Sequence, residues 1–276
     1  MNDPQPGAPA AFSLEERVAQ LERQLGLVEK YAVAGFWTAL DGAYRSSTDQ
    51  RTIECIVCGN TGAASSFKDH ISQCQFGGGE LRRHGCPKCG CIFGPLKYLD
   101  LNEDFVSADY QLLYSRYSEA DSTDNEILAF HSLSPTPGAL YLDWGSGGQW
   151  SKTIESLRAS GFEVWGYEPS APATSGFVVN TTDQISAKFD GIFSNNVIEH
   201  FRDPVSQFKY FAGILKSGGR MAHQTACYAY EYANTRFHTL FLLGDSPHVL
   251  AERTGFRAER VPAAHDSINY VYTKLT

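Results

Sequence analysis

Residues 139–148 read Ala-Leu-Tyr-Leu-Asp-Trp-Gly-Ser-Gly-Gly, an apolar run that ends at Asp143 and passes into a glycine-rich turn. The run from 139 to 143 has the length and composition of a buried strand. Glycines placed directly after a strand let the backbone turn tightly and approach a ligand closely. Because a helical pattern follows over 151–160, this stretch predicts the first strand–loop–helix unit of a wound sheet.

The alternation of strand and helix patterns continues to the end of the chain. Further strands are predicted over 163–168, 189–194, 220–225 and 269–275, and helices over 203–216 and 247–254. Strands separated by helical segments of this kind form parallel sheets with helices on both faces. The sequence therefore predicts an α/β fold with a doubly wound sheet over residues 138–276.

Six of the seven cysteines lie between positions 55 and 91, in a Gly-rich stretch with little periodicity. Cys55-Ile-Val-Cys58-Gly and Cys86-Pro-Lys-Cys89-Gly have the same spacing, and two such turns complete a tetrahedral thiolate shell. We predict a structural zinc site in a ribbon-like module over 50–100, since four protein ligands leave no position for a reactive water. The alternative is a set of buried thiols. Whether Cys74, Cys91 or His70 also binds metal stays open.

The N-terminal region begins with a Pro-, Ala- and Gly-rich stretch, residues 1–12, for which we predict disorder. Ser13 and Glu16 have the spacing of a capping box. An amphipathic helix is predicted over 13–45, with apolar residues at spacings of four and three: Leu14, Val18, Leu21, Leu25 and Val28. This face fits two interpretations, a helix folded back on its own domain and a short coiled coil that forms a homo-oligomer.

A helical linker is expected over 101–137, where Tyr110, Tyr114 and Tyr117 follow one another at spacings of four and three. This spacing favours a helix face packed on a domain.

The overall composition limits the partners and the location of the protein. A formal net charge of −8 and a pI of about 5.5 disfavour nucleic acid as a partner. No apolar run reaches the roughly 18 residues of a membrane span, and the first residues do not have the pattern of a secretory signal. We expect a cytoplasmic protein.

The loop after residue 143 discriminates between two classes of cofactor. A dinucleotide fingerprint counted from Gly145 requires a sixth-position glycine, where this chain has Trp150. S-adenosylmethionine carries no phosphate, and Asp143 would suit its ammonium group. Glu168, at the end of the next strand, would suit ribose hydroxyls, although an ordinary loop acid fits this position equally well. These residues favour S-adenosylmethionine.

Several further motifs join the glycine loop to one pattern. They are Gly166-Tyr-Glu168-Pro169-Ser170, Phe189-Asp190-Gly-Ile, Asn196-Val-Ile-Glu199-His200-Phe-Arg-Asp203-Pro204, Leu215-Lys-Ser-Gly218-Gly219 and His248-Val-Leu-Ala-Glu-Arg-Thr-Gly255-Phe256. In order and spacing they resemble class I S-adenosylmethionine-dependent methyltransferases. The resemblance implies a seven-stranded Rossmann-like sheet whose last strand runs antiparallel. With the two zinc knuckles in front, the chain is similar to the branch that includes deoxysugar C-methyltransferases.

The resemblance also implies a set of site residues. Cofactor contacts are expected at Asp143, Gly145, Ser146, Gly147, Glu168, Pro169, Asp183 and Asn195. His200 is the candidate base or substrate contact, because a neutral imidazole titrates near physiological pH. Glu199 either orients His200 or faces away. The alternative is that both residues begin a helix and pack.

The chain departs from the family pattern at two points. Gln149 occupies the place of the third loop glycine, and only about twenty residues separate Glu168 from Phe189, so the intervening helix is shortened or missing. Asn180, Thr182 and Asp183 are candidates for the adenine wall. The acceptor side is expected among His223, Tyr228, Tyr230, Tyr232 and His238.

The function implied is methyl transfer to a sugar acceptor, either a nucleotide-sugar or a polysaccharide. Two alternatives stay open: methylation of a small secondary metabolite or lipid precursor, and a catalytically silent zinc-containing binding protein.

Overall fold

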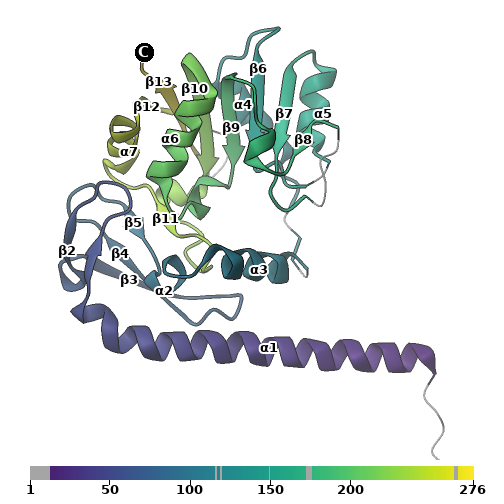
Figure 1. The fold of residues 1–276 in the computed structure, drawn as a ribbon, viewed down its shortest axis with the longest axis vertical. Coiled ribbons are helices and arrows are strands. Elements are labelled where there is room, and N and C mark those ends of the chain that lie inside the picture. The colour runs from purple at the N-terminus through teal and green to yellow at the C-terminus, as the bar shows by residue number, and fades with distance from the viewer. Residues whose placement is uncertain (1–12, 116, 119, 149, 172–175, 264–266) are drawn as a thin grey trace, which may run out of the picture.

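A central sheet of seven strands organises the C-terminal half of the chain in the computed structural model, which describes residues 13–115, 117–118, 120–148, 150–171, 176–263 and 267–276 (Figure 1). Its strand order is β12 (Phe256–Val261), β13 (Ile268–Lys274), β10 (Leu215–Thr225), β9 (Phe189–Asn195), β6 (Leu140–Trp144), β7 (Glu163–Tyr167) and β8 (Val178–Val179). β13 runs antiparallel to both of its neighbours, while the pairs from β10 to β8 are parallel. The predicted α/β class and seven-stranded sheet are confirmed.

Side chains alternate between the two faces of this sheet, as expected for strands buried on both sides. Ile192 and Met221 belong to the apolar cluster under α6 (Pro204–Ile214) and α7 (Ser246–Thr254). Their neighbours Phe193 and Ala222 belong to the cluster under α4 (Thr123–Ser132) and α5 (Lys152–Ala159). Helices therefore cover both faces, and the sheet is doubly wound.

The predicted helix over 203–216 ends earlier than the sequence pattern indicates. α6 ends at Ile214, and β10 begins at Leu215 with a register shift before Arg220. Lys274 donates hydrogen bonds to the carbonyls of Ala212 and Leu215, at 2.7 and 2.9 Å. A side chain from the last strand thus satisfies backbone groups at the helix end, which local sequence cannot reveal.

The connection between β7 and β9 is short, as the spacing of the two motifs indicates. In the part of it that the structure describes, regular structure consists of β8 and the 3₁₀ helix η3 (Thr182–Gln184). The remaining 3₁₀ helices are η1 (Thr48–Gln50), η2 (Ala64–Ser66), η4 (Ile198–His200) and η5 (Ala226–Ala229).

The Cys-rich stretch folds into strands that its weak periodicity does not predict. A two-stranded ladder joins β1 (Thr52–Glu54) to β2 (Thr61–Ala63). A second sheet has the order β11 (Leu240–Phe241), β5 (Ile92–Phe93), β4 (Glu80–Gly85) and β3 (Lys68–Gln73). Because β11 comes from the C-terminal half, this sheet unites segments on both sides of the proposed boundary at residue 100. The division of the chain into domains stays a prediction.

Two buried arginines form further contacts between the N-terminal segments and the C-terminal half. The Arg83 side chain is fully buried and donates to the carbonyls of Ala233, Thr235 and His238. Arg236 forms a two-pronged ion pair with Asp109, at 2.6 and 2.7 Å, and each side chain is only 3% exposed. Asp109 lies on α3 (Glu103–Tyr114), so the linker region is fixed to the C-terminal half.

The N-terminal helix α1 (Leu14–Ser47) runs beneath the body, and its first half extends past α3 (Figure 1). Its second half packs on α3 and on the short α2 (Leu96–Leu99), with Trp37 buried beside Tyr98. The Ser13–Glu16 capping box is present. No helix among the described residues is long and apolar enough to cross a membrane.

Candidate functional site

The carboxyl ends of β6, β7 and β9 lie side by side, because these strands are parallel neighbours. Ligands of wound sheets bind at this edge. It holds Asp143 at the end of β6, Glu168 directly after β7 and Asn195 at the end of β9. The sheet therefore brings together three residues that the sequence places in separate motifs.

The turn after β6 depends on its glycines. The backbone amides of Gly145 and Ser146 donate to the carbonyl of Tyr167, at 2.8 and 3.2 Å. Gly145 has a φ of +86°, and a Cβ there would lie 2.6 Å from Cγ2 of Val197. A side chain is thus disfavoured both by backbone conformation and by space. The departure at Gln149 falls outside the described residues.

Asp143 presents a buried carboxylate at this edge. Its side chain is 1% exposed, and within the described part of the chain neither carboxylate oxygen has a hydrogen-bond partner. Burial, followed by the nearby carboxylates of Glu126 and Glu168, raises the pKa of Asp143 well above its ordinary value. A cation bound here would offset this cost by stabilising the ionised form.

Two other polar side-chain atoms near this edge are also buried without a hydrogen-bond partner among the described residues. They are Ser146 Oγ and Asn195 Nδ2. Buried polar groups nearly always have a hydrogen-bond partner, so three side chains with unpaired polar atoms at the carboxyl ends of β6 and β9 indicate a polar ligand. An amino-acid moiety with an ammonium and a carboxylate matches this donor and acceptor set.

Glu168 connects the two loops of the edge. Its Oε1 accepts from the amide and hydroxyl of Ser170, at 2.9 and 2.6 Å, and its Oε2 accepts from the amide of Gly147 at 3.1 Å. The residue is half-buried, and Pro169 next to it is exposed. A carboxylate has about four lone-pair positions, so Glu168 can still accept bonds from a ligand hydroxyl.

The aromatic residues beside this edge form one wall. Trp144 stacks on Tyr167 with ring centroids 4.0 Å apart, and Tyr210 lies 5.7 Å from Trp144. Asp183, on η3, is exposed. The pKa of the Tyr210 phenol is raised, first by burial and second by the negative charge of Asp183. Asn180 donates from its side chain to the carbonyl of Ala171 at 3.0 Å.

His200 ends η4, close to the carboxyl end of β9. Its Nδ1 lies 2.7 Å from the Tyr110 hydroxyl and 3.0 Å from the carbonyl oxygen of Phe237. A carbonyl only accepts, so a hydrogen bond to Phe237 needs the proton on Nδ1, whereas the Tyr110 hydroxyl can donate to Nδ1 when the proton is on Nε2. The two contacts hold the imidazole in place and are compatible with either neutral tautomer.

Glu199 is buried next to His200 and points to a different set of partners. Its Oε1 accepts from the Thr225 hydroxyl at 2.7 Å. Its carboxylate also groups with the Cys227 thiol and the His238 imidazole, with ligand atoms within 4.8 Å of one another. Burial lowers the pKa of His238 to about 2, so its imidazole is neutral.

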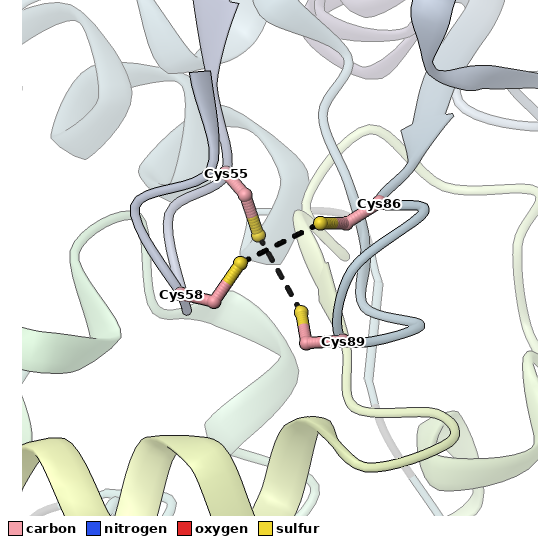
Figure 2. A group of neighbouring side chains, drawn as sticks. All are labelled: Cys55, Cys58, Cys86 and Cys89. Carbon is pink, nitrogen blue, oxygen red and sulfur yellow. Dashed lines mark hydrogen bonds between the residues drawn. The ribbon is translucent and has the colours of Figure 1, made fainter. Parts of the chain in front are cut away.

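The four knuckle cysteines converge on one point (Figure 2). The Sγ atoms of Cys55 and Cys89 are 3.7 Å apart, those of Cys58 and Cys86 are 3.5 Å apart, and all four lie within 4.8 Å of one another. A tetrahedral zinc with bonds of about 2.3 Å separates its sulfurs by about 3.8 Å. The thiol geometry therefore fits zinc.

The two knuckles have the same backbone structure. The amides of Gly59 and Gly90 donate to the carbonyls of Cys55 and Cys86, at 2.9 and 3.0 Å, and both glycines have positive φ values, +71° and +80°. Arg253 of α7 donates to the carbonyl of Val57 between the first two cysteines. The cluster is thus fastened to the C-terminal half.

The other candidate ligands lie apart from this cluster or beside it. His70 packs edge-on against Tyr230, and Cys74 lies 3.7 Å from an Arg236 nitrogen. Cys91 is fully buried near Cys55 but is not among the four grouped thiols.

Comparison with known proteins gives a family match for the C-terminal part of the chain. A family model described as a methyltransferase domain matches residues 118–259, more than half of the sequence. The chain belongs to this methyltransferase family. No curated protein matches the sequence significantly.

Solved methyltransferases align with this one at low identity. A methyltransferase of calicheamicin biosynthesis with bound S-adenosylhomocysteine shares 15% identity over 62% of this chain and 59% of its own, with a TM-score of 0.45. Mitomycin 7-O-methyltransferase shares 15% identity over 61% and 58%, with a TM-score of 0.46. The 1,6-didemethyltoxoflavin-N1-methyltransferase of Burkholderia thailandensis shares 18% over 76% and 100%, with a TM-score of 0.44. This chain thus spans somewhat less than two thirds of the first two.

Two of the five expected acceptor-side residues, His223 and Tyr228, lie in the interior, while Tyr232 is exposed. His223 is fully buried, with Nδ1 2.8 Å from the Ser194 hydroxyl, and burial lowers its pKa to about 3. Tyr228 is buried with its hydroxyl 3.1 Å from that of Tyr272. His238 is the member of the set that lies beside His200, with ring centroids 4.9 Å apart.

Sequence reasoning misses two residues that contact His200, Tyr110 and Phe237. The spacing of Tyr110 and Tyr114 indicates only a packed helix face, and no pattern marks Phe237. A pair of tyrosines four positions apart cannot indicate a histidine ninety residues away. The sequence could not identify the Phe237 contact, because the contacting atom is a backbone carbonyl oxygen, which every residue has.

Proposed function

We propose that this protein transfers a methyl group from S-adenosylmethionine to a sugar acceptor, and that a structural zinc ion stabilises its Cys-rich module. The observation that carries the cofactor assignment is the buried, orphaned carboxylate of Asp143 beside the glycine turn. The sugar acceptor rests on the resemblance of the two knuckles to the deoxysugar branch.

The proposed cofactor site uses the residues around the strand edge. Asp143 would hold the ammonium group, and the backbone of Gly145, Ser146 and Gly147 would surround the amino-acid moiety. Glu168 would accept from ribose hydroxyls, with Pro169 shaping its loop. Asn195 would donate to the amino-acid carboxylate, and Asp183 would face the adenine. When bound, the cofactor supplies an electrophilic methyl on a sulfonium.

The protein's own contribution is alignment of the acceptor and removal of its proton. His200 is the proposed base and would act through Nε2 in the tautomer whose Nδ1–H donates to the Phe237 carbonyl, with the Tyr110 hydroxyl beside it. Glu199 is proposed to fix the start of η4 through Thr225. A hydroxyl or an acidic C–H of a sugar would lose its proton to His200 as the methyl is transferred.

Zinc would be held by Cys55, Cys58, Cys86 and Cys89, and its role would be structural. Four protein ligands close the coordination shell, and the cysteines lie in the turns that join β1 to β2 and β4 to β5. The ion would connect β1–β2 to the β4–β5 region without contributing to the chemistry.

A second acceptor class also has support in the rings around the proposed base. The Tyr110 ring lies edge-on to His200 with centroids 5.7 Å apart, and the Phe237 ring lies 4.5 Å from Tyr110. Aromatic surroundings of this kind also suit a flat, apolar molecule. A small secondary metabolite or a lipid precursor is therefore the alternative acceptor. A catalytically silent zinc-containing binding protein is the remaining outcome.

The test is transfer of labelled methyl from S-adenosylmethionine into a lysate of the source cells, followed by separation by size. Label in nucleotide-sugars or in carbohydrate polymer supports the sugar assignment, and label in an apolar extract supports the alternative acceptor. If transfer does not exceed that of a His200→Ala, Glu168→Ala double variant, the silent binding protein is favoured. The proposed setting is the cytoplasm, with a homo-oligomer formed through α1.

A further inference from the structure

The first half of α1 carries an apolar face that its own body leaves uncovered. Five apolar residues at heptad spacing are between 45% and 76% exposed: Leu14, Val18, Leu21, Leu25 and Val28. Among the described residues of α1, the apolar clusters of the body begin with Val33. The interpretation of a helix folded back on its own domain therefore describes the second half of α1, while these five residues of the first half stay exposed.

The exposed face continues as a stripe of small residues along the second half of the helix. Extending the same heptad gives Ala32, Gly35, Ala39 and Gly42, all of them exposed. The opposite side of this half packs on the body through Val33, Phe36, Trp37 and Leu40. One uninterrupted seam thus runs over about four heptads, from large residues to small ones, on the side facing away from the body.

We propose that α1 forms a parallel, two-stranded coiled coil with α1 of a second copy of this chain. The first complete heptad places β-branched Val18 at position a and Leu21 at position d, a combination that favours two strands. The small residues Ala32, Gly35, Ala39 and Gly42 leave space for a second helix to approach closely. In this half of α1, the other side of the helix is already packed on the body of its own chain.

The flanking charges select the parallel orientation. Glu15, Glu22 and Glu29 occupy the e positions, and Arg17 and Gln24 occupy g positions. In a parallel pair, Arg17 faces Glu22 of the second copy. In an antiparallel pair, e positions face e positions, so the glutamates of the two helices would repel one another.

Anchoring of the helix to the body compensates for the shortness of the part of the seam that has large apolar residues, residues 14–28. An isolated helix of two or three heptads is marginal because it must be nucleated. Here Trp37 is 1% exposed, Asp41 pairs with Lys97, and the Tyr44 hydroxyl donates to Asp100 at 2.6 Å. The second half of α1 is therefore already helical before two copies meet. A parallel pair would also place both methyltransferase bodies at the same end of the coil.

The first test is the mass of the full-length, zinc-loaded protein by light scattering at micromolar concentration. We expect a dimer for the wild-type chain, and a dimer dissociation constant raised about 100-fold or more for Leu21→Asp, which buries a charge in the seam. Leu27→Asp is the matched control, since Leu27 is 69% exposed on the same helix but lies off the seam. Circular dichroism and zinc content establish that the variants fold.

The second test exchanges the charges of the proposed pair. Glu22→Lys should weaken a parallel dimer roughly threefold to tenfold, because it places a second cation against Arg17. Combining it with Arg17→Glu should restore the parallel dimer.

Three results would overturn the proposal: a monomeric wild-type chain, equal dissociation by Leu21→Asp and Leu27→Asp, and a tighter dimer with Glu22→Lys. Since the readout is mass, the proposal stands or falls independently of the methyl transfer.

Discussion

The hydroxyl of Tyr110 lies 2.7 Å from Nδ1 of His200, although the two residues are 90 positions apart in the chain. Tyr110 belongs to α3, in the segment that links the Cys-rich module to the methyltransferase sheet. The linker helix thus contributes directly to the environment of the proposed base. Together with the Phe237 carbonyl, it fixes the orientation of the imidazole.

Removal of this hydroxyl should impair the chemical step. For Tyr110→Phe we expect kcat to fall about tenfold and the dissociation constant for S-adenosylmethionine to stay unchanged, because the Tyr110 hydroxyl contacts His200 and is not among the proposed cofactor contacts. The pH dependence of kcat should also change. The control is Tyr114→Phe, on the same helix and 45% exposed. Equal losses in both variants would assign Tyr110 a packing role instead.

The cysteine cluster predicts one zinc ion per chain. Cys86→Ser should abolish stoichiometric zinc and lower the melting temperature, since metal binding is coupled to folding in small modules. Cys74→Ser should retain the metal, because Cys74 lies outside the four grouped thiols. Elemental analysis and thermal unfolding would measure both effects. The assignment would be refuted if the wild-type protein contained no zinc and its melting temperature equalled that of Cys86→Ser.

The Arg236–Asp109 pair should couple the linker helix to the C-terminal half strongly. Asp109→Asn should cost about 3–5 kcal/mol in the free energy of unfolding, because it leaves a buried guanidinium without its counter-charge. The double variant Asp109→Leu, Arg236→Met should cost less than the sum of the single changes. Chemical denaturation of Asp109→Asn, of the double variant and of its two component single variants measures these costs. Additive costs would mean that the pair does not act as a unit.

Stability should also decline in mild acid through buried neutral histidines. Burial lowers the pKa of His223 to about 3, below an unfolded value of about 6.5. Between these pH values the unfolded chain binds the extra proton, so this group reduces stability as pH falls from about 6.5 to about 3, by up to roughly 1.4 kcal/mol per pH unit.

The variant His223→Gln isolates this contribution. It should lower stability at pH 7, because it disturbs the contact with Ser194, but it should flatten the dependence on pH. Denaturation at a series of pH values, with zinc in excess, makes the comparison. Parallel curves for the two proteins would exclude His223 as the source.

Sequence patterns predict the sheet better than they predict the site. The observed bounds of β6, β7 and β9 lie within one residue of the predicted ones, so the positions of Asp143 and Glu168 follow from local pattern. The end of α6 does not follow, because Lys274 from the last strand satisfies the carbonyls there. β11 gives no signal because two residues carry no periodicity.

The contacts of the proposed base are beyond sequence reasoning for a different reason. They depend on how α3 and the segment around Phe237 pack on η4, and no spacing rule connects those segments. Likewise, His223 follows a strand pattern that suits either face of a sheet. Only its neighbours Phe208 and Phe211 place it in the core.

The measurement that tests the central claim most directly is calorimetric binding of S-adenosylmethionine to the zinc-loaded chain. We expect micromolar affinity for the wild-type protein and a loss of at least about tenfold for Asp143→Asn, since a charge-assisted hydrogen bond is worth about 1.5–3 kcal/mol. Asp190→Asn is the matched control, because Asp190 lies near the amino end of β9 and pairs with Lys216. Binding that is lost in Asp143→Asn and retained in Asp190→Asn would support the proposed site. Absence of binding to the wild-type chain at millimolar cofactor, or equal affinity for both variants, would contradict it.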